Sequence, residues 1–256
     1  MHIDLNCDMG ESYGRYTLGE DAPLMHVITS SNIACGFHAG DPEVMAATVQ
    51  MAVRKGVAVG AHPGYPDLQG FGRREMSMTH GQITAAVLYQ LGALAGFVHA
   101  AGSQLVHVKP HGALYNTAAR DARVAQAIVD AVYAFDPHLV IVTLPHSTLQ
   151  KTAEKAGLTA AREGFADRAY QSDGSLLPRS QPGAVIHNVD HIAARAVQMV
   201  TRREVESVDG TIIPLELDTL CVHGDTPGAL HIAQKVRSAL EMEGINLSAM
   251  HSFLQG

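Results

Sequence analysis

Histidine is unusually frequent in this chain, and five reactive side chains recur in one local setting. The sequence contains 15 histidines, against 18 lysines and arginines together. Histidine serves as a metal ligand, as a general acid or base, or as a satisfied core residue. Each side chain of interest follows an apolar run and has a glycine or proline within two residues, which lets the backbone approach a ligand. We predict that these five residues are functional: Asp8, His38, His62, His111 and His223.

Two chemistries suit a set of this composition. A carboxylate and two imidazoles, such as Asp8, His38 and His62, could hold a divalent metal with one position open to water. Alternatively, an aspartate or glutamate could act as general base while Lys109 and Arg168 stabilise negative charge without a metal. The sequence contains no tight ligand motif such as HExxH, so both alternatives stay open.

Other polar side chains also gather just after the predicted strands. In parallel α/β folds the loops that follow the strands meet on one face, where binding sites form. Side chains far apart along the chain would therefore meet there. Besides the residues above, we expect that face to carry Asn6, Glu11, Asp41, Lys109, Glu163, Asp167, Arg168 and Asp225.

Three polar residues have a simpler explanation. Asp41 precedes Pro42 and Glu43 and could serve only as a helix cap, although a cap can also line a pocket. Asp225 could fix the loop after the last strand. His107 alternates with apolar residues within a predicted strand, which is typical of a core histidine, so we leave it out of the site.

Apolar runs alternate with amphipathic stretches along the chain. The runs predict strands over residues 3–7, 27–35, 57–61, 105–108, 139–144, 159–163 and 219–222. Capping residues and helical apolar stripes predict helices over residues 42–55, 79–97, 116–135, 147–156, 188–201 and 227–243.

This alternation implies right-handed crossovers and a parallel sheet. About seven strands suit an irregular (β/α)7 TIM-like barrel better than an open Rossmann sheet. Neither GxGxxG after the first strand nor GxxxxGK[ST] occurs, so the standard nucleotide fingerprints are absent. We expect one catalytic α/β barrel domain over residues 1–256.

Two long segments are candidates for lids over the site. Residues 165–183 are rich in polar residues, Gly and Pro, and carry Asp167, Arg168 and Tyr170. Residues 64–77 carry Arg73 and Arg74. Irregular loops of this length are uncommon unless they cover a site, and a solvated excursion is the alternative.

The composition argues against several classes of partner. The net charge is −7 and no cluster of Lys and Arg is present, which argues against nucleic acid or an anionic membrane. No apolar run approaches the roughly 18 residues that a membrane span needs. Three cysteines without a CxxC pair argue against a disulfide framework, and the N-terminus lacks the features of a signal peptide. We expect a cytoplasmic protein.

Six strings resemble those of the LamB/YcsF family. In chain order they read DLNCDMGE (4–11), NIACGFHAGD (32–41), GAHPGYPD (60–67), VKPHGALYN (108–116), EGFADRAY (163–170) and VHGD (222–225). The strings are long and specific, the match covers essentially the whole chain, and the pattern shows no departure.

The resemblance implies a barrel of the glycoside hydrolase/deacetylase type. It implies ATP-dependent opening of the lactam of 5-oxo-L-proline to L-glutamate, with ADP and phosphate as the other products, and two partner subunits, B and C. A divalent metal, either Mg²⁺ with ATP or an ion bound by Asp8, His38 and His62, stays an open question.

For this reaction we predict two groups of residues. Lys109 and Arg168 would neutralise phosphate or the substrate carboxylate, Asp8 or Glu163 would activate water, and the histidines would orient groups or pass protons. The predicted catalytic residues are Asp8, Glu11, His62, Lys109, His111, Glu163 and Arg168. The predicted substrate-binding residues are Asn6, His38, Asp41, Asp167, Tyr170, His223 and Asp225.

Two other functions are consistent with the same residues. One is a stand-alone, metal-dependent hydrolase similar to carbohydrate deacetylases, which the barrel and the Asp/His set would suit. The other is a non-catalytic subunit that binds substrate for a partner. The absent P-loop keeps this second alternative open, because another subunit could bind the ATP.

Overall fold

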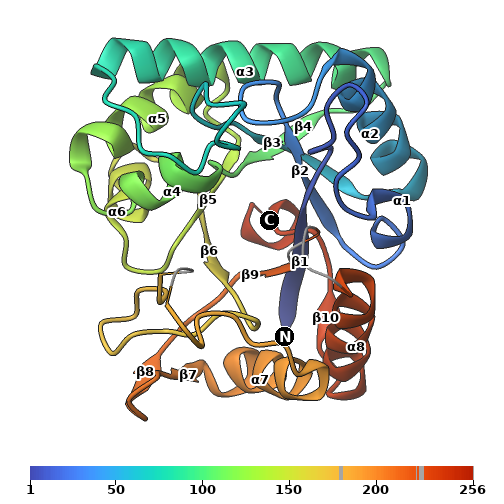
Figure 1. The fold of residues 1–256 in the computed structure, drawn as a ribbon, viewed down its shortest axis with the longest axis vertical. Helices are drawn as coiled ribbons and strands as arrows, with labels where there is room; N and C mark the ends of the chain where they lie inside the picture. Colours follow the sequence, from blue (N-terminus) through green and yellow to red (C-terminus); the bar gives the residue numbers. More distant parts are fainter. Residues whose placement is uncertain (179–180, 223, 225–227, 256) are drawn as a thin grey trace.

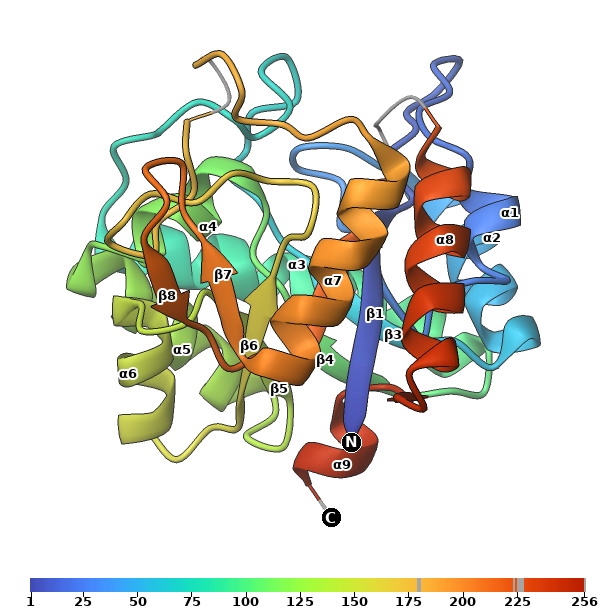
Figure 2. The same ribbon diagram turned by 90° about the horizontal axis from the view of Figure 1, so that it is seen from below.

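Seven parallel strands close into a barrel in the computed structural model, which describes residues 1–178, 181–222, 224 and 228–255. The ring runs β1-β2-β3-β4-β5-β6-β9 and closes because β9 pairs with β1. Figures 1 and 2 show it from two perpendicular directions. The strands span His2–Met9 (β1), Ser30–Ala34 (β2), Ala58–His62 (β3), Leu105–Val108 (β4), Val140–Thr143 (β5), Ala160–Gly164 (β6) and Thr219–Val222 (β9). The predicted irregular TIM-like barrel is confirmed.

Helices surround the barrel and cover its strands (Figure 1). They span Asp21–Leu24 (α1), Pro42–Lys55 (α2), His80–Ala100 (α3), Gly112–Ala118 (α4), Ala122–Phe135 (α5), Thr148–Lys155 (α6), Val189–Arg202 (α7), Ala229–Met242 (α8) and His251–Leu254 (α9). The side chains of Asp41, Thr79, Ser147 and Asn188 cap their helices, each accepting a hydrogen bond from a backbone N–H, and the cap at Asp41 was predicted. The predicted first residue of the last helix, Pro227, lies outside the described residues.

The single helix predicted over residues 116–135 is wrong. The segment forms α4 and α5, and α4 already begins at Gly112, directly after His111. Asp121 causes the break, because its side chain accepts a hydrogen bond from the backbone N–H of Arg123 and so caps a new helix.

Five short elements were not predicted: α1, β7, β8, β10 and α9. The antiparallel hairpin of β7 (Glu204–Glu206) and β8 (Ile212–Pro214) lies outside the barrel, as Figure 2 shows. Strand β10 (Asn246–Leu247) pairs with the beginning of β1, and α9 follows it. These elements are too short to show a periodic pattern and depend on tertiary contacts.

Helix α3 is long and apolar enough to cross a membrane by length and composition, although no such segment was predicted. In the structure it packs along α5 on the outside of the barrel (Figure 1). Its buried Gln90 accepts a hydrogen bond from the Gly64 N–H and donates one to the Gly64 carbonyl. This packing explains its apolar face, which includes Ile83, Val87, Leu91 and Leu94.

Buried Asp4 ties three barrel strands together. Its carboxylate accepts hydrogen bonds from the hydroxyls of Thr29, Ser30 and Thr219, and from the backbone N–H of Met250 just before α9. Burial nevertheless raises the pKa of Asp4 to about 6, because desolvation of the charged form outweighs these donors.

We expect Asp4 to make the stability of the chain depend on pH. The folded state holds the Asp4 proton with a pKa of about 6, whereas the ordinary value is 3.8. Stability should therefore fall as pH rises through this interval, relative to Asp4→Asn, by up to about 3 kcal/mol. Urea unfolding of both proteins between about pH 4 and pH 7 tests this. Parallel pH profiles would contradict it.

The backbone of Gly60 lies directly against the His107 ring. A Cβ at Gly60 would lie 2.0 Å from His107 Nε2. His107 is buried, as predicted for a core histidine, and its Nε2–H donates to Asn32 Oδ1 at 2.8 Å. The absence of a side chain at Gly60 therefore allows β4 to support Asn32 on β2.

Gly60→Ala should destabilise the protein by about 1–3 kcal/mol, because the new methyl group must displace the His107 ring. Gly96→Ala is the matched control: nothing lies within 4 Å of its Cβ, and it occupies an exposed helical position in α3. We expect the control to add about 0.5–1 kcal/mol of stability. Equal effects of the two substitutions on urea unfolding would refute the steric explanation.

Candidate active site

A buried lysine joins four of the barrel strands. The Lys109 Nζ, just after β4, lies 2.9 Å from Asp8 Oδ1 on β1 and 2.8 Å from Glu163 Oε1 on β6. It also lies 3.2 Å from Cys221 Sγ on β9 and 3.3 Å from Asn6 Oδ1. The Lys109 side chain is 3% exposed. Asp8, Lys109 and Glu163, three predicted site residues far apart along the chain, therefore lie in direct contact.

The charges in this network stabilise one another. Burial alone would raise the pKa of Asp8, but His62 and Lys109 hold it well below its usual range. Burial alone would lower the pKa of Lys109, but Asp8, Cys221 and Glu163 raise it well above its usual range. Asp8 is therefore a carboxylate, and Lys109 an ammonium, at neutral pH.

Two amides orient the carboxylates. The Asn32 side-chain N–H groups donate to Asp8 Oδ1 at 2.9 Å and to Asn6 Oδ1 at 2.7 Å. The Asn6 amide in turn donates to Glu163 Oε1 at 3.1 Å and to the Thr219 hydroxyl at 2.6 Å. Sequence reasoning identified Asn6 but missed Asn32, although Asn32 begins the second of the family strings.

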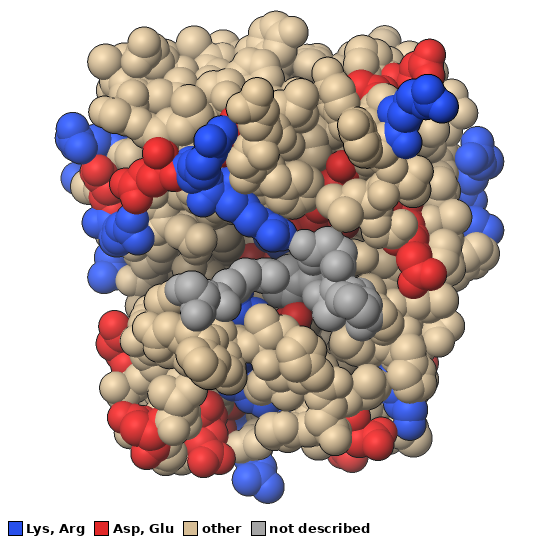
Figure 3. All heavy atoms as spheres, in the orientation of Figure 1, with Lys and Arg blue, Asp and Glu red and all other residues tan. Residues whose placement is uncertain are grey.

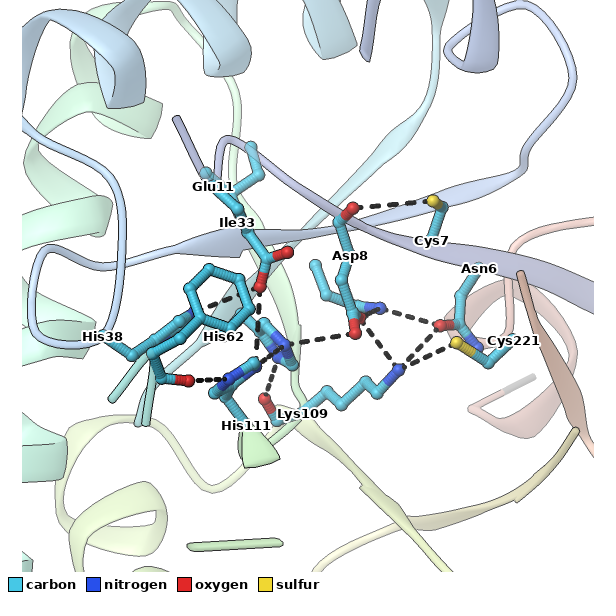
Figure 4. Close-up of polar contacts among 12 residues, drawn as sticks. Asn6, Cys7, Asp8, Glu11, Ile33, His38, His62, Lys109, His111 and Cys221 are labelled. Atoms are coloured by element: carbon cyan, nitrogen blue, oxygen red, sulfur yellow. Dashed lines mark hydrogen bonds and ion pairs between the residues drawn. The ribbon is translucent and has the colours of Figure 1, made fainter. Parts of the chain in front are cut away.

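Three histidines and a glutamate form the other half of the site (Figure 4). His62 Nε2 lies 3.3 Å from Asp8 Oδ2 and 2.9 Å from His111 Nδ1. Glu11 Oε1 lies 3.3 Å from His38 Nε2 and 3.5 Å from His111 Nδ1. The rings of His38 and His111 stack with centroids 3.7 Å apart. Asp8 therefore connects the lysine network to this cluster.

The loop over residues 64–77 completes the histidine cluster. His111 Nε2–H donates to the Phe71 carbonyl at 2.8 Å, and the Phe71 ring lies edge-on to His111. Phe71 has φ 55° and Gly72 has φ 62°, so two successive residues adopt the left-handed conformation. A non-glycine residue adopts it only when its surroundings hold it there. A Cβ at Gly72 would lie 2.8 Å from the His111 ring, so the loop packs directly on the cluster.

Burial keeps two of the histidines neutral. It lowers the pKa of His111 to about 3, with His62 adding to the effect. It also lowers the pKa of His38 well below the usual range, helped by His111 and His62. Neutral imidazoles have lone pairs that can accept a proton or bind a metal.

The donor atoms of the cluster are close enough together to hold one metal ion. One atom from each of Glu11, His38, His62 and His111 lies within 4.8 Å of every other. The expected set was Asp8, His38 and His62. Both histidines of that set belong to the cluster, whereas Asp8 Oδ1 accepts hydrogen bonds from Lys109 and Asn32.

Two carboxylates of the site, those of Asp8 and Glu11, are partly exposed to solvent. The Asp8 side chain is 17% exposed and that of Glu11 10% exposed, whereas Glu163 and His38 are fully buried. Figure 3 shows the face formed by the loops after the strands, with basic atoms bordering acidic ones near its centre. A bound molecule would therefore meet Asp8 and Glu11 first.

The remaining predicted residues have other contacts or are not described. The Asp41 carboxylate caps α2 and accepts a hydrogen bond from the Gly14 N–H. The Arg168 guanidinium donates to the carbonyls of Leu177 and Ala184, which holds the 165–183 loop together. Tyr170 is buried in the same loop, where its hydroxyl accepts from the Phe165 N–H.

Asp167 is buried in the 165–183 loop, and its backbone carbonyl accepts a hydrogen bond from the Ile186 N–H. His223 and Asp225 lie outside the described residues. Tyr115 was not predicted. It is buried near Glu163, and burial together with Glu163 raises its pKa well above the usual value.

The fold and the site together define a parallel α/β barrel with a carboxylate–lysine–histidine centre at the C-terminal ends of its strands and in the loops that follow them. The chain belongs to the LamB/YcsF family, whose model matches residues 3–255. It is 54% identical over 250 residues to the A subunit of 5-oxoprolinase from Syntrophobacter fumaroxidans, an alignment that covers 98% of this chain and 99% of that protein.

Solved structures agree with this assignment. The lactam utilization protein from Thermus thermophilus is 48% identical, has a TM-score of 0.94, and the match covers 97% of this chain and 100% of that chain. The Bc1960 peptidoglycan N-acetylglucosamine deacetylase is 12% identical with a TM-score of 0.51, over 99% of this chain and 88% of that one. The second likeness concerns the fold alone, and it agrees with a barrel of the deacetylase type.

Removing the Lys109 ammonium should lower the stability of the folded protein. Lys109→Met leaves Asp8 and Glu163 buried without their shared cation, which should cost about 3–5 kcal/mol of stability. Lys151→Met, at an exposed position of α6, is the matched control and should change stability by no more than about 0.5 kcal/mol. Urea unfolding at neutral pH measures both. A Lys109→Met protein as stable as the control would show that the ion cluster contributes little to stability.

Proposed function

We propose that this chain is the A subunit of an ATP-dependent 5-oxoprolinase, which opens the lactam of 5-oxo-L-proline to L-glutamate and releases ADP and phosphate. The names of its relative in Syntrophobacter fumaroxidans and of the lactam utilization protein support the substrate class. The observation that carries the proposal is the partly exposed Asp8 carboxylate beside the Lys109 ammonium.

The reaction needs activation because amide resonance makes an unstrained lactam a poor electrophile. Transfer of a phosphoryl group from ATP to the lactam oxygen would make the carbonyl carbon of the ring more electrophilic. Water then adds to that carbon, the ring C–N bond breaks, and the nitrogen takes up a proton. A second water hydrolyses the resulting acyl phosphate, so one ATP and two waters yield glutamate, ADP and phosphate. Such steps depend on positioning and charge neutralisation.

We assign the handling of water to Asp8 rather than Glu163. Glu163 is fully buried, whereas the Asp8 side chain reaches solvent and is held in place by Asn32 and Lys109. In this proposal Asp8 aligns the attacking water and receives its proton, and the nearby Lys109 stabilises negative charge on the reacting oxygen. His38, His62 and His111 form the adjoining wall and orient groups bound against it.

We further propose that the chain works with subunits B and C, with ATP as co-substrate accompanied by Mg²⁺, in the cytoplasm. The residues described here form no standard phosphate-binding loop, so ATP bound by another subunit would be consistent with this arrangement. Cys7, Cys35 and Cys221 are free and buried, which fits a reducing compartment.

Reconstitution tests this function. The chain is combined with B and C subunits and assayed for glutamate from 5-oxoproline with and without ATP. We expect ATP-dependent glutamate formation, and at least a ~100-fold lower rate with Asp8→Asn. Asp190→Asn, a control at an exposed position of α7, should be as active as the unmodified chain.

Three outcomes would overturn the proposal: glutamate formed without nucleotide, no glutamate from the complete assembly, or a fully active assembly containing Asp8→Asn. An assembly that retains 5-oxoproline binding with Asp8→Asn but loses turnover would separate a catalytic role from simple substrate delivery.

A further inference from the structure

His62 and His111 each use one ring nitrogen to donate to a backbone carbonyl. His62 Nδ1 lies 2.7 Å from the Lys109 carbonyl oxygen, and His111 Nε2 lies 2.8 Å from the Phe71 carbonyl oxygen. A carbonyl oxygen only accepts, so both of these nitrogens must carry the hydrogen. This geometry fixes the tautomer that each ring adopts in its neutral form.

In that neutral form the other two ring nitrogens face each other as lone pairs. His62 Nε2 and His111 Nδ1 are 2.9 Å apart and buried. Glu11 Oε1 adds negative charge 3.5 Å from His111 Nδ1, and Asp8 Oδ2 lies 3.3 Å from His62 Nε2. Acceptors this close repel one another unless a positive centre, a proton or a metal ion, lies among them.

We propose that this positive centre is a divalent metal ion bound by His62 Nε2, His111 Nδ1 and Glu11 Oε1. Ligand atoms about 2.0–2.1 Å from a tetrahedral ion lie about 3.3–3.4 Å from one another. The observed separations of 2.9 Å and 3.5 Å are near this value. Histidine ligands typically donate their second N–H to a backbone carbonyl, as both of these rings do.

His38 positions a ligand rather than binding the ion. Its ring lies parallel to His111, with an angle of 4° between the planes, so the lone pairs of the two rings cannot converge on one ion. Its Nε2 is instead 3.3 Å from Glu11 Oε1, where an N–H holds the carboxylate toward the two histidines. The inferred ligand set is therefore narrower than the four-residue cluster.

The ligand types and the local charge select the class of ion. Two imidazoles and one carboxylate suit Zn²⁺ and similar transition metals better than Mg²⁺, which prefers oxygen ligands. Among the described residues, two carboxylate oxygens lie beside the facing ring nitrogens: Asp8 Oδ2 is 3.3 Å from His62 Nε2 and Glu11 Oε1 is 3.5 Å from His111 Nδ1. Oxygens so placed would favour a divalent cation between the rings.

The fourth position of the ion would be open beside Asp8, on the part of the site that solvent reaches. A metal ion there could polarise a water molecule or a carbonyl oxygen. The inference concerns ion binding alone, so it stands or falls separately from the lactam chemistry.

Metal titration of the full chain tests the inference without substrate or partner subunits. The chain is freed of metal with a chelator and titrated with Zn²⁺ by calorimetry, and with Co²⁺ by visible absorption. We expect one ion per chain, cobalt bands of tetrahedral intensity, and a higher Tm with bound Zn²⁺. His62→Gln and His111→Gln should each weaken binding on the order of 100-fold or more. His99→Gln, on the exposed side of α3, is the control and should bind as tightly as the unmodified chain.

Folding of the variants is checked by comparing their circular dichroism and Tm with those of the unmodified chain, all without metal. Glu11→Gln keeps the shape of a ligand without its charge and should also weaken binding, so the inference stays testable if a histidine variant does not fold. Failure of the unmodified chain to bind one ion would overturn it, and the facing nitrogens would then share a proton instead. Equally tight binding by His62→Gln and His111→Gln would place the ion elsewhere and overturn it too.

Discussion

Burying the Lys109 ammonium requires carboxylates beside it, and this charge balance is the constraint on which the rest of the site depends. Removal of an ion from water costs several kcal/mol, which only close, well-oriented partners can offset. Asp8 and Glu163 come from strands on either side of β9, so the charges meet only when the barrel closes. The Asn32 and Asn6 amides then hold both carboxylates in place.

The histidine half of the site depends on backbone geometry more than on charge. Positive φ angles at Phe71 and Gly72 bring the Phe71 carbonyl to His111, where it accepts a hydrogen bond from the ring. The Lys109 carbonyl accepts a hydrogen bond from His62 in the same way. Lys109 therefore serves both halves, through its ammonium on one side and its carbonyl on the other. Asp8 lies between them and reaches solvent, which makes it the residue through which a bound molecule would meet both.

The barrel fold alone does not decide the chemistry. A deacetylase with 12% identity shares the architecture, whereas the LamB/YcsF family is recognised through specific strings over almost the whole chain. Those strings coincide with the site, because Asp8, His38, His62, Lys109 and Glu163 each lie within one of them. Barrel folds can carry different reactions because side chains in the loops after the strands vary while the core persists.

The sequence by itself determined the seven strands, most helix caps and the gathering of Asn6, Asp8, His62, Lys109 and Glu163 at one end of the barrel, because periodicity and capping are local signals. It misjudged the break at Asp121, where a side-chain cap interrupts a continuous apolar stripe. Only the tertiary structure decided that Asn32 supports Asp8, that Arg168 clamps its own loop, and which histidine nitrogens carry hydrogen. Such roles depend on distances between atoms remote in sequence, which no local pattern encodes.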